Sequence, residues 1–207
     1  MSRIGALGLL LTVLAGPSLA ADEGGMGACV GPAAAQLSLD DQIANCTLAI
    51  RAGRDARADL ARDFFARAQA FRMRGAYDLA VADYSQAIRL SPGDAAALVN
   101  RGNAYRAQGK LDLALADYNR AIRLRPGDSV AFDNRGRTYA AKGDMARAIA
   151  DFDQAIRLKP NSAIPLYNRG LAKLKSGDAA GGQVDIDAAK ALDPNLGKTP
   201  AAHSATL

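Results

Sequence analysis

The sequence predicts an all-α fold, an α-solenoid of stacked antiparallel helix pairs. The first observation is a period of 34 residues, which carries Gly102 onto Gly136 and Pro126 onto Pro160. The second is that apolar residues in each half of the period lie three or four positions apart, the spacing of one helix face. The third is a pair of breaks, glycine between the halves and proline at the end. Such a period is typical of helix-turn-helix units that stack on one another.

The two clearest copies are residues 95–128 and 129–162. The first has small, aromatic and helix-breaking residues at Gly102, Tyr105, Gly109, Ala114, Tyr118, Ala121 and Pro126. The second repeats them at Gly136, Tyr139, Gly143, Ala148, Phe152, Ala155 and Pro160. We expect the small residues to let two helix backbones approach and the large rings to fill the space beside them. Gly109 should adopt the positive φ of a helix end.

Weaker copies flank these two. Residues 61–94 keep most of the series but have Ala68 in place of the first glycine. In residues 163–196, Lys173 replaces the tyrosine, Gly182 replaces an alanine and Ile186 takes the large position. An end unit packs on one side only, so weaker terminal copies are expected.

This pattern resembles the tetratricopeptide repeat (TPR) family, in the style of exported bacterial members. The resemblance divides the chain into TPR 1 (61–94), TPR 2 (95–128), TPR 3 (129–162) and a degenerate TPR 4 (163–196). It implies a TPR superhelix whose concave groove binds a protein or peptide partner.

Residues 1–20 read as a secretory signal peptide. A positive start at Arg3 is followed by a short apolar run, a Gly16-Pro17 break and small residues before Ala20. We expect cleavage after Ala20, with Ala21 as the second choice. The mature protein would then be periplasmic or secreted, with no membrane insertion after processing.

Residues 21–60 are expected to form an N-terminal capping segment with one helix over 41–52. Cys29 and Cys46 are the only cysteines, and in an oxidising compartment they predict a structural disulfide. Their spacing does not suit a redox pair, and two isolated thiols make a poor metal site. At the other end, residues 197–207 are small and polar and are expected to form a disordered tail.

Matched charges recur in all four copies. An arginine of the first helix is followed sixteen positions later by an aspartate of the second, in the pairs Arg67 and Asp83, Arg101 and Asp117, Arg135 and Asp151, and Arg169 and Asp185. Because the aspartates follow the arginines in every copy, we expect structural ion pairs. An arginine-lined ligand groove is the alternative reading.

Three asparagines occupy one position of the first helices. In the TPR family this position faces the concave groove, so the resemblance implies a peptide-binding groove of Asn100, Asn103, Asn134, Arg137, Tyr167 and Asn168. Side-chain amides both donate and accept, so they read a peptide main chain without demanding one sequence. The alternative is that the asparagines are inherited with the unit. The family's C-terminal carboxylate clamp is not expected, because Ala96, Val130 and Ile164 are apolar at the matching positions.

The sequence does not favour catalysis. It lacks the common phosphate-binding, serine-hydrolase and zinc-protease motifs, and its single histidine, His203, lies in the expected tail. Basic and acidic residues alternate without a basic run, which disfavours nucleic acid as a partner. We therefore expect a non-catalytic interaction scaffold of the cell envelope with no cofactor or metal. The alternatives are an accessory subunit of an envelope enzyme or secretion complex, docking through its outer face or tail, and an enzyme with an unrecognised site.

Overall fold

A computed structural model describes residues 29–30, 36–53 and 56–196. The predicted signal peptide, its cleavage site and the predicted tail lie outside these residues. Within them the chain forms helices only, which are α1 (Leu39–Arg51), α2 (Arg57–Met73), α3 (Tyr77–Leu90), α4 (Ala95–Ala107), α5 (Leu111–Leu124), α6 (Ser129–Ala141), α7 (Met145–Leu158), α8 (Ala163–Lys175) and α9 (Ala179–Leu192).

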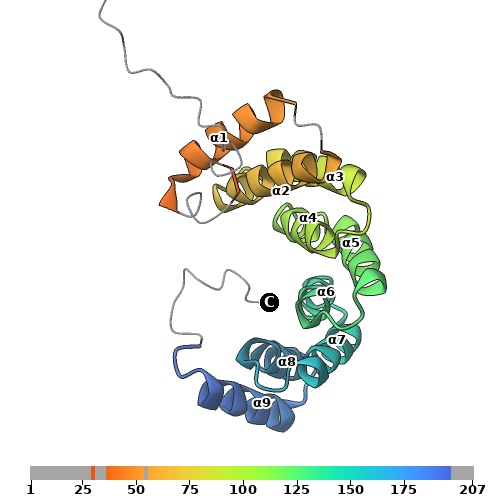
Figure 1. The fold of residues 1–207 in the computed structure, drawn as a ribbon. Coiled ribbons are helices and arrows are strands. Elements are labelled where there is room, and N and C mark those ends of the chain that lie inside the picture. Colours follow the sequence, from red (N-terminus) through yellow and green to blue (C-terminus); the bar gives the residue numbers. More distant parts are fainter. Residues whose placement is uncertain (1–28, 31–35, 54–55, 197–207) are drawn as a thin grey trace, which may run out of the picture.

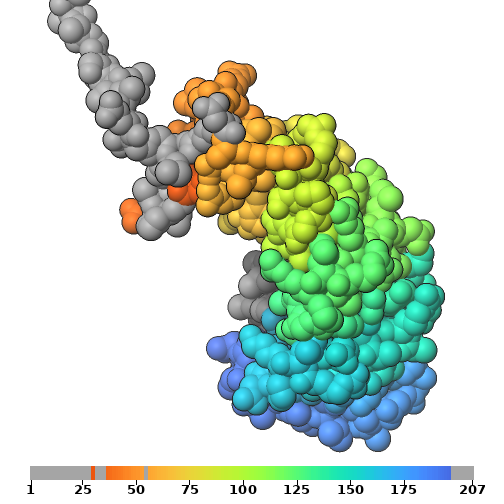
Figure 2. Space-filling model, turned by 45° about the vertical axis from the view of Figure 1, so that its right-hand side comes forward, coloured from red at the N-terminus to blue at the C-terminus, as the bar shows by residue number. Residues whose placement is uncertain are grey.

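The helices form a curved array (Figure 1). Each of α2, α4, α6 and α8 packs against the helix that follows it, and each pair stacks on the next. The first helices of the pairs line the inner side of the curve and the second helices line its outer side (Figure 1). The space-filling view shows the pairs as one continuous body that follows the chain order (Figure 2). The predicted α-solenoid of antiparallel helix pairs is therefore confirmed.

Local sequence explains where the helices begin and end. Gly109, between α4 and α5, has φ +73°, a backbone conformation that other residues rarely adopt. Asp94 and Asp128 precede α4 and α6, and each side chain accepts hydrogen bonds from two backbone N–H groups of the first turn. The capping helix α1 begins two residues earlier than predicted, because Ser38 accepts a hydrogen bond from the Asp41 N–H.

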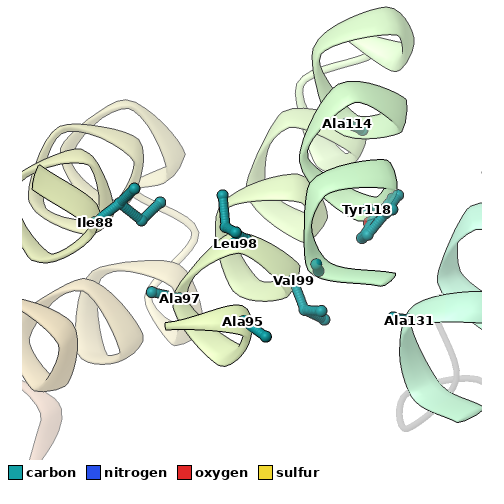
Figure 3. Close-up of a cluster of buried hydrophobic side chains, with 9 residues drawn as sticks. Ile88, Ala95, Ala97, Leu98, Val99, Ala114, Tyr118 and Ala131 are labelled. Carbon is teal, nitrogen blue, oxygen red and sulfur yellow. The ribbon is translucent and has the colours of Figure 1, made fainter. Parts of the chain in front are cut away.

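Small residues of the first helices lie against large side chains of the second helices. A Cβ atom on Gly102 would lie 2.7 Å from the Tyr118 ring, and one on Gly136 would lie 2.8 Å from the Phe152 ring. Tyr118 belongs to a buried cluster that joins residues of α3, α4, α5 and α6, among them Ile88, Leu98 and Ala131 (Figure 3). The apolar core therefore runs from one helix pair into the next, as stacking requires.

A close approach between α8 and α9 yields a first prediction, at Gly170 of α8. A Cβ there would lie 2.8 Å from both the backbone oxygen of Gly182 and Cγ1 of Ile186. A backbone atom cannot rotate aside, so Gly170→Ala is expected to destabilise the fold by about 1–3 kcal/mol, in spite of alanine's better helix propensity. Urea unfolding followed by circular dichroism measures the change.

Gly127 provides the matched control. Its φ is not positive, and a Cβ there would meet no atom within 4 Å. Gly127→Ala is therefore expected to change the free energy of unfolding by less than about 0.5 kcal/mol. If Gly170→Ala were as stable as the wild type, the close approach would not be a constraint on this sequence.

Candidate functional site

The four arginines at the shared first-helix position each grip the aspartate of their own repeat at two points. The guanidinium Nε and Nη2 atoms donate to the two carboxylate oxygens, at 2.6 and 2.9 Å for Arg67 and Asp83, 2.8 and 2.7 Å for Arg101 and Asp117, 2.8 and 2.7 Å for Arg135 and Asp151, and 2.7 and 2.6 Å for Arg169 and Asp185. These four pairs are called the ladder below. The structure thus brings together each pair expected from the sequence.

The remaining Nη1 atom of each ladder arginine reaches the second helix of the preceding unit. It donates to Thr47 at 3.0 Å, to Ser85 at 2.9 Å, to Asn119 at 2.7 Å and to Asp153 at 2.7 Å. Each arginine therefore joins three helices from two neighbouring units. Our sequence reasoning missed these acceptors, although the period places Ser85, Asn119 and Asp153 at one position and all three carry an acceptor oxygen.

The ladder arginines have few donors left for a ligand. Their side chains are only 17–20% exposed, and Arg101 and Arg135 also lie over the rings of Tyr105 and Phe132. The hydrogen bonds that Arg101 and Arg135 donate to Asp117 and Asp151 raise the pKa values of the two arginines, although burial opposes the shift. This geometry favours the structural reading of the arginines over a ligand groove.

In the last unit Lys173 extends the ladder. Its Nζ lies 2.9 Å from Oδ2 of Asp185, which Arg169 also grips. Burial alone would raise the pKa of Asp185, but the hydrogen bonds from Arg169 and Lys173 hold it below the usual value. The lysine that replaces the repeat's tyrosine thus adds an ion pair where the other copies have a ring.

Cys29 and Cys46 are joined by a disulfide. Both cysteines are buried in a small cluster with Ala49, against which Ala66 of α2 packs. One residue after Cys46, Thr47 accepts the hydrogen bond from Arg67. The capping helix α1 is thereby attached to the first repeat by packing on α2 and by the first step of the ladder.

The six candidate groove residues lie on the inner helices, but they differ in how open they are. Asn100 is half-buried, and its Nδ2 donates to the Ala96 carbonyl of its own helix at 3.0 Å. Tyr167 is also half-buried. By contrast, Asn134, Arg137 and Asn168 are 6, 9 and 4% exposed. The burial of these three was not foreseen, because the sequence pattern gives the face of a helix and not the depth of the surface there.

Several of these residues meet in one cluster, called the central polar cluster below. Its members come from α4, α5, α6 and α8 and are Asn103, Arg106, Tyr118, Asp133, Arg137 and Asn168. Tyr118 donates its hydroxyl hydrogen to Asn103 at 2.8 Å, and Asn168 donates to Asp133 at 2.9 Å. Arg106 and Asp133 were not among the candidates. Asp133 lies one turn from Arg137 on the same face of α6, which is the face that the TPR resemblance assigns to the groove.

Burial shifts the titration of the central polar cluster. It lowers the pKa of Arg137 to about 10, and the nearby positive charge of Arg106 acts in the same direction. Burial raises the pKa of Asp133, although the hydrogen bond from Asn168 partly offsets the effect. Burial also raises the pKa of Tyr118 to about 12. The cluster thus holds two guanidinium groups and one carboxyl group in a poorly hydrated position.

The described residues contain neither a metal-ligating group of side chains nor a helix that could span a membrane. Among residues 29–30, 36–53 and 56–196, no group of three or more histidine, cysteine, aspartate or glutamate side chains is arranged to hold a metal ion. No helix in the same ranges combines the length and apolar character that a membrane span requires.

Several proteins of known structure have a fold similar to that of this chain. It resembles MamA 41-end from Desulfovibrio magneticus RS-1, at 16% identity, with a TM-score of 0.68 over 77% of this chain and 88% of that one. It also resembles YrrB, described as a TPR protein with an unusual peptide-binding site, at 20% identity and a TM-score of 0.62 over 76 and 79% of the two chains. A third neighbour is the first TPR of Spaghetti (RPAP3) bound to the HSP90 peptide SRMEEVD, at 22% identity and a TM-score of 0.57 over 58 and 95%.

Sequence similarity identifies the family of the chain but no individual relative. No curated protein matches the chain. A family model described as tetratricopeptide repeat matches residues 95–128, and one described as TPR repeat matches residues 68–106 and 136–177. These matches fall on the helix pairs whose stacking, small-to-large packing and period are described above. The chain belongs to the tetratricopeptide repeat family.

Proposed function

We propose that this protein is a non-catalytic interaction scaffold of the cell envelope, which binds a protein or peptide partner along its concave face. The observation that carries the proposal is the mixed character of the inner helices α6 and α8. Val130 and Ile164, in their first turns, are 58 and 40% exposed, and the central polar cluster lies one to two turns further along α6. Exposed aliphatic side chains beside fixed polar groups suit an extended peptide.

Family membership supports the same class of function. TPR proteins generally mediate protein–protein contacts and carry no catalytic machinery of their own. Two of the structural neighbours are described by the peptides they bind or by a peptide-binding site. A solenoid groove selects its partner through individual surface residues, so the fold supports the class of partner and the side chains must specify it.

The proposed location rests on two features. Residues 1–20 have the composition of a secretory leader, and Cys29 and Cys46 form a disulfide, which persists in oxidising compartments and is rare in the cytosol. Periplasmic or secreted protein would keep this bond, and the capping helix would remain attached.

A second candidate function is docking of this chain as an accessory subunit through its outer face. Leu79 of α3 and Leu113 of α5 are 53 and 49% exposed and occupy the same repeat position on neighbouring outer helices. Aliphatic side chains stacked in this way could contact a larger assembly. The predicted tail, the other proposed docking element, lies outside the described residues.

Site-specific photo-crosslinking separates the two candidates. A benzophenone amino acid is placed at Val130 or Ile164 on the inner helices, or at the matched outer position Leu113, in the full chain expressed in its native host. We expect one partner to be crosslinked from the two inner positions, in the periplasmic fraction, and to be absent from the outer one. Crosslinks from Leu113 alone would reject the concave face and favour outer-face docking. Products confined to the cytosol would reject the envelope location.

A further inference from the structure

Arg137, on the concave face, is a buried cation for which the described residues supply no acceptor at Nε or Nη2. Its side chain is nine-tenths buried, and its Nε and Nη2 atoms are shielded from solvent. In the described part of the chain neither atom finds an acceptor, and no carboxylate lies within ion-pair distance of this guanidinium. By contrast, Nε, Nη1 and Nη2 of each ladder arginine all donate hydrogen bonds. A buried charge without partners is destabilising unless something else supplies them.

The surroundings of Arg137 carry an excess of positive charge. Arg106 is close enough for its charge to disfavour the protonated form of Arg137, and its Nε is also buried without an acceptor. The nearest carboxyl group, on Asp133, is already engaged by the amide of Asn168. The cluster therefore offers unmet guanidinium donors and a net charge of one, two cations against one carboxylate.

We propose that the central polar cluster is the binding site for one carboxylate of the partner, an aspartate or glutamate side chain within an extended segment. This inference rests on the proposed function. A carboxylate would accept a hydrogen bond from Nη1 of Arg137, the guanidinium nitrogen that is not shielded from solvent, and its charge would balance the excess positive charge of Arg137 and Arg106. A phosphate would carry a second negative charge towards Asp133, which disfavours it.

The exposed apolar residues favour a side chain over the end of a partner chain. Val130 shares a face of α6 with Asp133 and Arg137, and Ile164 begins the neighbouring inner helix α8. Partner residues on either side of the acidic one would therefore find aliphatic contacts on the same face. A chain terminus would leave part of this surface uncovered.

The test is a display selection of random linear peptides on the full chain, with the randomised segment followed by a constant sequence that keeps the peptide terminus away from the groove. We expect the selected peptides to share an aspartate or glutamate at one position. A synthetic peptide from the selection should bind about tenfold or more tightly with aspartate there than with asparagine, the usual worth of a charged hydrogen bond. Fluorescence anisotropy measures both affinities.

Variants assign the preference to the cluster. In Arg137→Gln the difference between the aspartate and asparagine peptides should vanish, and Arg106→Gln should reduce it. The control is Arg123→Gln, an exposed arginine of α5 that makes no hydrogen bond or ion pair with the described residues, and it should keep the full difference. Because Arg137→Gln removes a buried unpartnered charge, its thermal unfolding temperature should equal or exceed that of the wild type.

The outcomes separate the failure of this inference from failure of the proposed function. Peptides that bind on the concave face without an acidic preference would overturn the inference alone. Binding that requires a free peptide carboxy terminus would overturn it in favour of terminus recognition. A selection that yields no binding peptide at all would overturn the peptide groove, and the inference with it.

Discussion

Replacing Arg135 with alanine is expected to lower the free energy of unfolding by about 3 kcal/mol, as is typical when one partner of a buried ion pair is removed. Asp151, whose side chain is 8% exposed, would keep a charge without its bidentate partner. Asn119 on the preceding unit would also lose its donor. Urea unfolding followed by circular dichroism measures the loss. The matched control is Arg123→Ala, at an exposed position that forms no ion pair with the residues that the structure describes.

The companion variant Asp151→Ala should cost a similar amount, because Arg135 is then left with two unpaired donors. In the double variant no buried charge remains unbalanced, so its cost should be well below the sum of the two single changes. Additive costs would show that Arg135 and Asp151 do not stabilise the fold as a pair. The ladder would then be a set of independent contacts.

Removing the disulfide, by Cys29→Ser with Cys46→Ser, is expected to destabilise the amino-terminal cap by about 3 kcal/mol, the value of closing a loop of this size in the chain-entropy model. The two cysteines are 17 residues apart. In a solenoid each unit contacts only its neighbours, so the effect should stay local. Because α1 packs chiefly on α2, backbone amides of α1 should exchange with deuterium faster while those of α6 to α9 keep their protection.

Two comparisons control this experiment. Reduction of the wild-type protein should reproduce the exchange pattern of the double serine variant, and the re-oxidised wild type should return to the original pattern. Faster exchange spread evenly from α1 to α9 would show that the whole solenoid unfolds as one unit. Unchanged exchange in α1 would show that packing on α2 is sufficient to hold the cap.

The sequence was sufficient to predict the architecture because the residues that determine it are local and recur. Gly109 must accept a positive φ, and Gly102 must admit the Tyr118 ring, so both leave a clear mark in a repeated pattern. The ladder pairs were also predictable, since every copy has an arginine at the position of Arg135 and an aspartate at the position of Asp151. Lys173 was not predictable in this way. It stands where other copies have a tyrosine, so the sequence indicated only a degenerate repeat, and its ion pair with Asp185 depends on how α8 packs against α9.

The central polar cluster could not be predicted in the same way. Asp133 and Arg137 each occur once at their repeat positions, and Arg106 recurs only as Arg72, so the period does not mark these residues as a group. Their meeting depends on how far α4, α6 and α8 turn relative to one another, which is set by the packing of whole units. The burial of Asn134 and Asn168 has the same origin. The residues that recur in every copy determine the fold, whereas the candidate site is formed largely by residues that differ between copies.

The Nη1 contacts of the ladder arginines have a mechanical consequence. Each one joins a helix pair to the pair before it, at the boundary where the solenoid would have to open if it were stretched. With a charged hydrogen bond across every boundary between the described units, the solenoid should resist stretching along its whole length. A ligand held along the inner curve would then meet a surface of nearly constant pitch.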